Sequence, residues 1–285
     1  MQAEQGAQKT RSHLFLRHVA VPNEHGSWVF LFSPLLIGLF AGGTFHTGSY
    51  LLVGAALSAF MLRQPITVLV KILSKRRPRT ELPAAAFWIA VYGFLGLGFL
   101  IGLIALGYVP LLFLAAPALP VFAWHLWLVS RRSERRQPIV EIVGSGVLGL
   151  VAPAAYWVGV GHYDPTGWLL WGLTWLQAAV SICYAYLRLE QRVWKSVPTK
   201  VECWLAGRKH IAAAAAAVIL VSALAVFNVV PAWLPLAYAI QLTETIWGTF
   251  NPAIKVKPTL IGIRQLIVST LFTLAFILTW IFPVV

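Results

Sequence analysis

Charged residues are scarce in this chain of 285 residues, and acidic ones are the scarcest. Asp and Glu together number 9, with a single aspartate at Asp164, and all charged residues make up 11%. Hydrophobic residues make up 59%, and the mean hydropathy is +0.77. Ordinary soluble domains carry about 25% charged residues. This composition therefore excludes disordered, collagen-like and disulfide-stapled chains and nearly all water-soluble folds, and it indicates a membrane protein with several spans.

Cysteine and metal-binding patterns are also lacking. The two cysteines, Cys183 and Cys203, lie in an apolar run and in a basic loop, so no disulfide is implied. Three histidines near the N-terminus, His13, His18 and His25, do not have the spacing of a metal site on one helix face. We therefore expect no metal and no cofactor.

Long uncharged runs give the number of helices. A helix needs about 20 apolar residues to cross the hydrocarbon core of a bilayer. Residues 82–130 contain no Asp, Glu, Lys or Arg, which leaves room for two spans, and residues 211–243 behave likewise. We predict an all-α polytopic membrane helix bundle of about nine transmembrane helices, because barrel strands are much shorter and alternate in polarity. The predicted spans are 27–45, 49–70, 83–106, 109–129, 139–160, 167–187, 210–228, 231–250 and 260–283.

The basic residues alternate strictly with these spans. Lys and Arg number 22. All but two lie in the N-terminal tail or at every second connection between spans, and the two exceptions, Arg63 and Arg264, lie within spans near the same helix ends. The other four connections, 43–49, 107–110, 161–166 and 228–231, contain none. By the positive-inside rule, the N-terminus is inside and the C-terminus outside. Topology thus explains the net charge of +13 without nucleic acid, and the inner face is expected to attract anionic lipid head groups.

The same map predicts the domain organisation. The longest polar stretch, Arg188–Arg208, is too short for a soluble domain. We therefore expect a cytoplasmic N-terminal segment at 1–26 and a single nine-helix transmembrane domain at 27–285. No small-residue cleavage site follows the basic start, so no signal peptide is expected. The expected location is a cell membrane, and the oligomeric state is left open.

Ionisable residues in or beside the spans are functional candidates, because burying a charge in lipid is costly. Most of them gather at the inner helix ends. One hypothesis is a cytoplasm-facing cavity whose arginines bind an anionic or lipidic small molecule by bidentate contacts. The alternative is a set of structural ion pairs, in which Glu141 and Glu244 each pair with one of the inner-end arginines. The candidate ligand-binding residues are Glu24, His25, Arg63, Glu141, Arg188, Glu190, Glu244 and Arg264.

Two short segments carry a family resemblance. Residues 22–28 (PNEHGSW), followed by Pro34 and Gly38, resemble the opening of the bacterial YwiC-like membrane proteins, which reads roughly P-x-E-H-G-[AS]-W. Residues 257–265 (KPTLIGIRQ) resemble the start of their last span. By its pattern of spans the resemblance covers the full length. It implies a bacterial inner-membrane protein and assigns no activity.

The predicted layout also resembles that of the UbiA-type intramembrane prenyltransferases. Those enzymes hold Mg²⁺ and a prenyl diphosphate on two Asp-rich motifs, at the inner ends of the second and sixth spans. Here those places carry residues 63–65 (RQP) and 188–190 (RLE), so Mg²⁺-dependent prenyl transfer in its usual form is not expected. A divergent UbiA-like prenyltransferase, a small-molecule transporter and a structural role remain alternatives. Transport is disfavoured because few polar residues, namely Thr174, Gln177 and Gln241, lie near the midplane.

The one-sided placement of the basic residues makes the topology testable. An alkaline phosphatase fused after Val285 should be active, because the positive-inside rule places the C-terminus outside the cytoplasm. A fluorescent protein that folds only in the cytoplasm should stay dark at the same position. Fluorescence from that fusion, with a silent phosphatase fusion, would contradict the predicted orientation.

Overall fold

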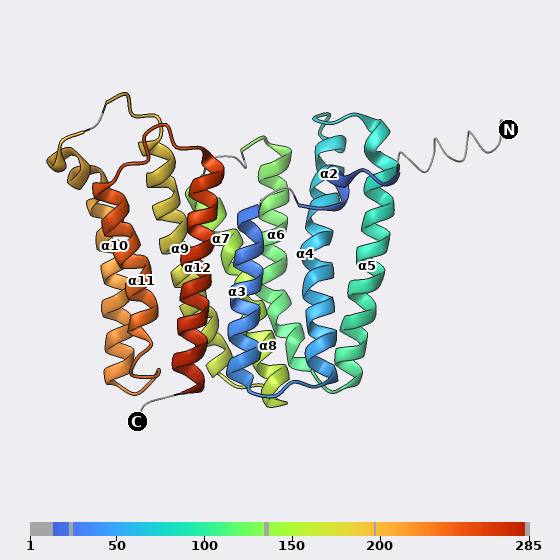
Figure 1. The fold of residues 1–285 in the computed structure, drawn as a ribbon. Helices are drawn as coiled ribbons and strands as arrows, with labels where there is room; N and C mark the ends of the chain where they lie inside the picture. Colours follow the sequence, from blue (N-terminus) through green and yellow to red (C-terminus); the bar gives the residue numbers. More distant parts are fainter. Residues whose placement is uncertain (1–13, 23–24, 134–136, 197, 283–285) are drawn as a thin grey trace. The chain divides into compact units, whose positions relative to one another are not determined.

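The computed structural model describes residues 14–22, 25–133, 137–196 and 198–282 (Figure 1). Within these ranges all regular structure is helical and no strand occurs, which confirms the predicted all-α class. The elements are α2 (Arg17–Ala20), α3 (His25–Gly42), α4 (Thr47–Leu73), η1 (Arg79–Glu81), α5 (Leu82–Ala105), η2 (Val109–Leu114), α6 (Ala115–Ser130), α7 (Pro138–Gly149), α8 (Val151–Val160), α9 (Thr166–Gln191), α10 (Lys200–Val226), α11 (Pro235–Phe250) and α12 (Pro258–Ile281).

Each of the nine predicted spans coincides with a helix or with two consecutive helices. In the described chain, seven helical segments are long and apolar enough to cross a membrane, which indicates a multi-pass membrane protein. The shorter helices α3 and α11 have 18 and 16 residues. At 1.5 Å per residue they reach about 27 and 24 Å, slightly less than a hydrocarbon core of about 30 Å. The number of nine crossings therefore stays a prediction.

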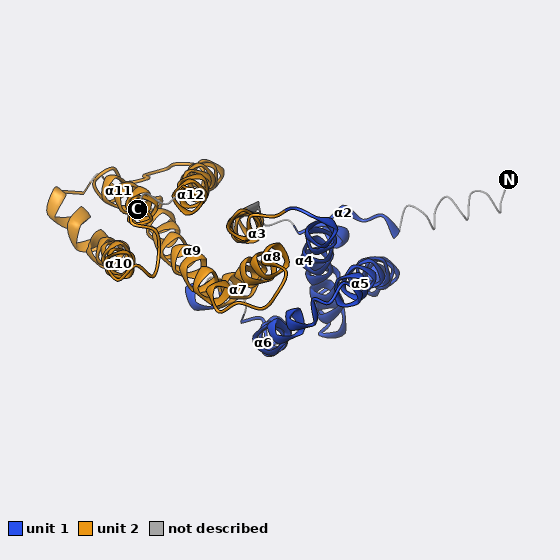
Figure 2. Ribbon diagram, turned by 90° about the horizontal axis from the view of Figure 1, so that it is seen from below, with its two compact units in different colours: residues 1–25, 45–140 blue, residues 26–44, 141–285 orange. Residues whose placement is uncertain are grey.

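The chain divides into two compact units (Figure 2). Unit 1 comprises residues 1–25 and 45–140, and unit 2 comprises residues 26–44 and 141–285. Helix α3 therefore belongs with helices α8 to α12, although α4 follows it directly in the chain. The single transmembrane domain expected from the sequence stays a prediction.

In unit 1, the segment that precedes α3 lies against the α4–α5 pair. The Gln64 side-chain amide donates a hydrogen bond to the carbonyl of His18 (2.8 Å), and the Trp88 indole donates to the carbonyl of Leu14 (3.0 Å). Val19 is fully buried in a cluster with residues of α4 and α5. Because α2 has only four residues, far fewer than a stable isolated helix needs, these contacts hold it in place.

The core of unit 2 lies among α9, α10, α11 and α12. Its largest buried side chains include Tyr238 from α11 and Phe272 and Phe276 from α12. Tyr238 is 1% exposed, and its hydroxyl donates to the carbonyl of Leu173 in α9 at 2.8 Å. A buried hydroxyl without a partner would be destabilising, so this bond fixes how α11 sits on α9.

The loop before α9 is organised by the one aspartate of the chain. The Asp164 carboxylate accepts a hydrogen bond from the backbone N–H of Thr166 (2.7 Å). The backbone carbonyl of Asp164 accepts another from the Trp157 indole (2.7 Å). Hydrogen bonds from the Thr166 side chain and backbone lower the pKa of Asp164 below its ordinary value. This loop residue therefore holds the start of α9 against α8.

Helix α3 packs closely against α8 through glycines. A Cβ atom on Gly42 would lie 2.9 Å from the Cα of Gly159, and a Cβ on Gly38 would meet the carbonyl oxygen of Ala152. The obstacle is backbone in both cases, which cannot swing aside as a side chain does. Small residues at such contacts let membrane helices approach closely.

This contact predicts that Gly42→Ala destabilises the protein by about 1–3 kcal/mol, the usual range for overpacking a tight site. Unfolding in detergent, followed by intrinsic tryptophan fluorescence, would measure the loss. Gly144→Ala in α7 is a matched control, because a Cβ there has nothing within 4 Å and alanine favours helix. Equal stability of the two variants would contradict the close packing of α3 on α8.

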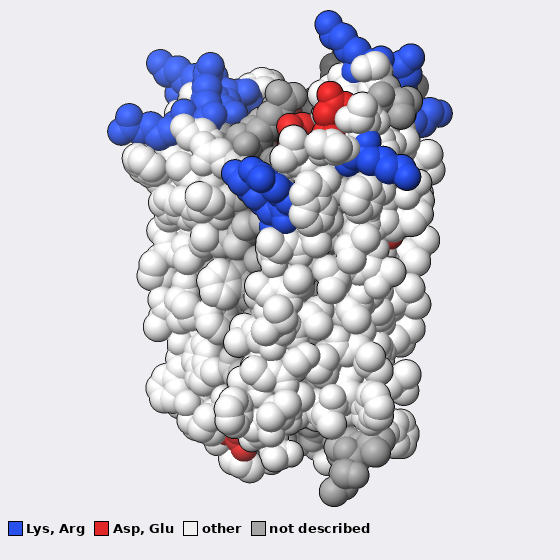
Figure 3. Space-filling view, turned by 90° about the vertical axis from the view of Figure 1, so that its left-hand side faces the viewer, with Lys and Arg blue, Asp and Glu red and all other residues white. Residues whose placement is uncertain are grey.

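Basic side chains mark one end of the helices of unit 2. On the face shown in Figure 3, Lys and Arg gather at one end, and the broad surface below them shows none. The chain places Arg192, Lys200 and Lys257 there, where α9 ends and where α10 and α12 begin. The basic residues of unit 2 thus lie at one end of its helices, as the sequence predicts. Which end faces the cytoplasm stays a prediction.

Candidate functional site

Three helices of unit 2 bring buried charges together at this basic end. Arg188 lies in the last turn of α9, Glu244 in the second half of α11, and Arg264 in the second turn of α12. Arg188 is 6% and Glu244 8% exposed, whereas the Arg264 side chain is 42% exposed. These are three of the eight predicted candidate residues, and we call them the inner cluster.

Glu244 is held by a bidentate ion pair. Arg264 donates from Nε to Oε1 (2.6 Å) and from Nη2 to Oε2 (2.7 Å). The Tyr184 hydroxyl donates a third hydrogen bond to Oε1 at 2.7 Å. Such parallel arginine–carboxylate bonds are among the strongest side-chain interactions. The expectation that Glu244 pairs with an arginine is confirmed.

Arg188 has a different environment, made of neutral oxygens. Its Nη1 donates to the side-chain oxygen of Gln191 (2.7 Å) and to the carbonyls of Gly248 (2.6 Å) and Asn251 (2.7 Å). Gln191 is fully buried and donates to the same Gly248 carbonyl at 3.1 Å. These bonds satisfy carbonyls at the C-terminal end of α11, where a positive charge is also favoured by the helix dipole.

An aromatic side chain connects the two arginines. The Trp247 ring lies 3.6 Å from the guanidinium carbon of Arg264 and 5.6 Å from that of Arg188. The Tyr184 ring lies 5.9 Å from the same atom of Arg188. Both distances to Trp247 are within the range of cation–π attraction, which is strongest where water is excluded.

The formal charges of the inner cluster do not cancel. Two arginines contribute two positive charges, and Glu244 contributes one negative charge. In the described residues, the hydrogen-bonding partners of Arg188 are all neutral. The site therefore carries an excess of one positive charge in a largely buried position, an arrangement suited to an anion and unsuited to a metal cation. The described residues contain no group of three His, Cys, Asp or Glu side chains able to hold a metal ion.

The remaining candidate residues lie elsewhere. Glu141 is exposed and accepts a hydrogen bond from the Tyr186 hydroxyl (2.7 Å), and within the described part of unit 2 it forms no ion pair with Arg188 or Arg264. A pairing with Arg63, the third arginine expected, stays a prediction. Arg63 belongs to unit 1, where it lies 5.6 Å from the ring of Phe60. Glu190 is exposed at the end of α9. Glu24 and the side chain of His25 lie outside the described residues.

Sequence reasoning missed three side chains of the site, Tyr184, Gln191 and Trp247. Each lies three or four residues along its own helix from a charged residue that was predicted, so each shares a helix face with it. That spacing was visible in the sequence, but charge was the only signal used. Aromatic residues are common at the ends of membrane helices as interfacial anchors, so residue type alone does not mark Tyr184 or Trp247 as part of a site.

A second polar layer lies near the middle of the helices of unit 2. Gln177 in α9 donates to the side-chain oxygen of Gln241 in α11 (3.2 Å), and the side-chain nitrogen of Gln241 donates to the Thr245 hydroxyl (3.3 Å). Ser181 in α9 donates to the side-chain oxygen of Gln265 in α12 at 2.9 Å. More polar groups lie near the midplane than the sequence analysis counted.

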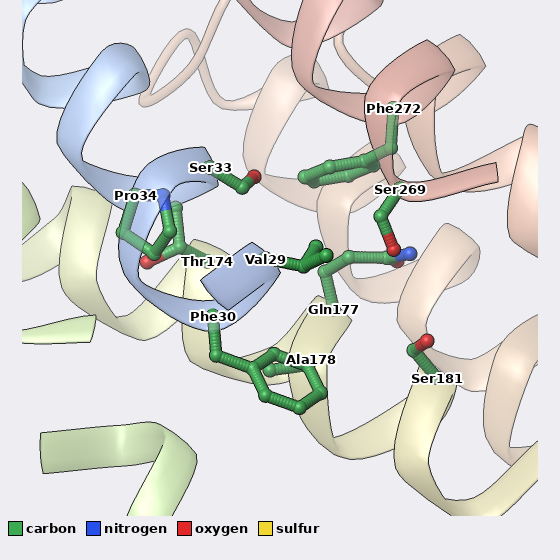
Figure 4. A pocket seen from close by; sticks show the side chains of 10 residues that line it. All are labelled: Val29, Phe30, Ser33, Pro34, Thr174, Gln177, Ala178, Ser181, Ser269 and Phe272. Carbon is green, nitrogen blue, oxygen red and sulfur yellow. The ribbon is translucent and has the colours of Figure 1, made fainter. Parts of the chain in front are cut away.

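A small pocket adjoins this layer, and Figure 4 shows the side chains around it. It is formed by α3, α9 and α12, all of unit 2, and has about 20 Å³ of space for the centres of water molecules. That is room for about one water molecule. The lining residues are Val29, Phe30, Ser33, Pro34, Thr174, Gln177, Ala178, Ser181, Ser269 and Phe272.

Comparison with known proteins identifies part of the chain. The family model described as "YwiC-like protein" matches residues 21–156. This segment is YwiC-like. The YwiC-like segment contains the opening motif at 22–28 that carried the resemblance, and it ends before α9. The inner cluster therefore lies outside the matched residues.

A curated relative of the chain is the "Uncharacterized protein YwiC" of Bacillus subtilis (strain 168), which is 26% identical over 150 residues. The match covers 53% of this chain and 59% of the relative, so the chain spans less than two thirds of its length. No solved structure matches the chain. The UbiA-like layout stays a prediction.

The inner cluster predicts that Glu244→Gln is strongly destabilising. The substitution keeps the side-chain shape but leaves two neighbouring arginines without a carboxylate. We expect a loss on the order of 3 kcal/mol, the lower end of the range for breaking a buried ion pair, because Arg264 is partly exposed. Unfolding in detergent micelles would measure it.

Glu190→Gln serves as the matched control, because this carboxylate is exposed at the end of α9 and should change stability by less than about 0.5 kcal/mol. Adding Arg264→Gln to Glu244→Gln should recover part of the loss, because it removes one unpaired charge. Similar losses in the two single glutamate variants would show that the ion pair contributes little.

Proposed function

We propose that this protein is a bacterial inner-membrane protein that binds the anionic group of a lipidic small molecule at the inner cluster. The observation that carries the proposal is the buried charge of Arg188, whose described hydrogen-bonding partners are all neutral. An isolated charge in a low-dielectric environment costs several kcal/mol unless it is paired. A bound phosphate or carboxylate would supply the missing negative charge.

The free edge of the Arg188 guanidinium supports this. All three of its described hydrogen bonds leave from Nη1, so Nε and Nη2 make none to the described residues. These two nitrogens form the planar fork that binds carboxylate and phosphate groups by two parallel bonds. Arg264 already uses its own fork for Glu244. Arg188 is therefore the better anchor for a ligand.

The ligand's apolar part has a natural place in the surrounding lipid. Exposed large apolar side chains beside the cluster, including Ile246, Trp247 and Ile263, are suited to acyl or isoprenoid chains. An amphiphile could thus keep its tail in the bilayer while its anionic head reaches Arg188. The proposal therefore has the ligand enter from the membrane rather than through a long aqueous channel.

Transport is a second candidate function, because the polar midplane layer supplies one of the features that a transporter needs. Gln177, Gln241 and Ser181 are buried in the middle of their helices, at 5%, 1% and 5% exposure. Buried polar side chains in membrane helices often mark a solute pathway. Charged residues are scarce toward the other end of the helices, which favours binding over transport of an ion.

The proposal predicts that Arg188→Gln loses anionic lipid. Purified protein would be delipidated in mild detergent, incubated with phosphatidylglycerol or with zwitterionic phosphatidylethanolamine, and analysed by native mass spectrometry. Wild type should retain phosphatidylglycerol preferentially, and the variant should bind it at least about tenfold more weakly, because a hydrogen bond to a charged group contributes about 1.5–3 kcal/mol.

Arg208→Gln is the matched control, since Arg208 is exposed at the same basic end of unit 2. Arg188→Lys keeps the charge, and the protein should fold with intermediate lipid retention because the fork is lost. Inorganic phosphate, tested by thermal shift, distinguishes a soluble anion from a lipid head group. Equal retention by the Arg188→Lys, Arg208→Gln and wild-type proteins would mean that Arg188 only caps α11.

A further inference from the structure

The pocket of unit 2 is lined by hydrogen-bond acceptors whose protons are directed elsewhere. The Ser181 hydroxyl donates to Gln265 (2.9 Å), and the Thr174 hydroxyl donates to the carbonyl of Leu170 (2.9 Å). A hydroxyl has one proton, so the lone pairs of both oxygens remain available.

The Ser33 hydroxyl also directs its proton away from the pocket, toward Thr273. Its oxygen lies 2.6 Å from the oxygen of Thr273, and the Thr273 hydroxyl donates to the carbonyl of Ser269 at 2.8 Å. Because Thr273 has already used its proton, Ser33 must be the donor in the bond between the two hydroxyls. Ser33 therefore also presents only lone pairs to the pocket.

The orientation of the Gln177 amide is set by a chain of bonds that starts at Thr245. The Thr245 hydroxyl donates to the carbonyl of Gln241 (2.7 Å) and so can only accept from the Gln241 side-chain nitrogen. The oxygen of that side chain then accepts from the Gln177 nitrogen. Gln177 is left with its oxygen, Oε1, which is buried and has no hydrogen-bond partner among the described residues.

Helix α3 contributes one more acceptor to the same place. Pro34 lies inside α3, and both Pro34 and Phe30 line the pocket. Proline has no N–H, so it cannot donate the helical hydrogen bond to the carbonyl four residues earlier, at Phe30. In membrane helices such freed carbonyls are satisfied by neighbouring groups or by ordered water.

We infer that this pocket holds a single neutral hydrogen-bond donor of water size, bound to Oε1 of Gln177. Apart from Ser269, whose hydroxyl can donate or accept, the polar lining accepts and does not donate, which disfavours an anion. No carboxylate lines the pocket, and the inner cluster nearby carries excess positive charge, which disfavours a cation. The volume suits about one water molecule. Water and ammonia share the required chemistry.

The bound molecule would connect three helices that are distant in the chain. It would bridge Gln177 of α9 to the Ser33 hydroxyl or to the freed Phe30 carbonyl of α3. Ser269 of α12 can turn its proton or its lone pairs toward it. Figure 4 shows the Gln177 side chain reaching from α9 toward Ser269. Buried water of this kind makes about three hydrogen bonds and is costly to remove. This inference is independent of the anion site proposed above.

Radiolytic hydroxyl labelling in detergent micelles tests it. Radicals formed from a bound water oxidise the side chains beside it, even when bulk solvent cannot reach them. Phe272 lines the pocket and is 1% exposed, whereas Phe276, one turn further along α12, is 0% exposed and does not line it. We expect Phe272 to be labelled several times faster than Phe276. Equal labelling of the two rings would overturn the inference.

Gln177→Met gives the second measurement. It keeps the length of the side chain and removes the acceptor, so Phe272 labelling should fall to the Phe276 level. Gln241→Met, the matched control, breaks the same bond between the glutamines but keeps the Gln177 amide, whose oxygen can still accept from the bound molecule, so labelling should persist. Persistent labelling in Gln177→Met would also refute the assignment. If ammonia is the occupant, an ammonium salt at alkaline pH should suppress Phe272 labelling and raise the Tm, and if water is the occupant, it should do neither.

Discussion

Placing a carboxylate inside a membrane protein is tolerable only when it is fully paired, and the arrangement of α9, α11 and α12 depends on how Glu244 meets this condition. Its two oxygens accept three hydrogen bonds, two from Arg264 and one from Tyr184. Because these donors lie on different helices, the pairing fixes the rotation of each helix about its own axis. The apolar contacts of the core can then form between the correct faces.

The sequence predicted most of the helices correctly, because a bilayer sets both their length and their composition. It did not predict that α3 groups with α8 to α12, because the hydropathy of a helix does not show which other helices it packs against. The glycine contact between Gly42 and Gly159 decides that choice, and shape complementarity between such distant residues cannot be found from hydropathy.

The candidate site was predictable in part. Whether a residue could be predicted depended on how far it lies within a span and on which side chains surround it. Glu244, Arg188 and Arg264 could be found because a charge within a span has few alternatives to burial. Glu141 does not join the inner cluster because it lies near a helix start, where it is exposed and accepts a hydrogen bond from Tyr186. The acceptor role of Gln177 could not be found at all, because it depends on where the protons of its neighbours point.

The discontinuity of unit 2 has a consequence for biosynthesis. Helix α3 leaves the ribosome early, but its packing surface on α8 does not exist until the residues between Gly42 and Gly159 have been synthesised. At usual elongation rates this takes on the order of 10 s. During that interval the glycine face of α3 is without its partner while residues 45–140 of unit 1 are synthesised. Insertion factors that shield polar or small-residue helix faces would therefore act on α3 longer than on any helix whose partner follows it directly.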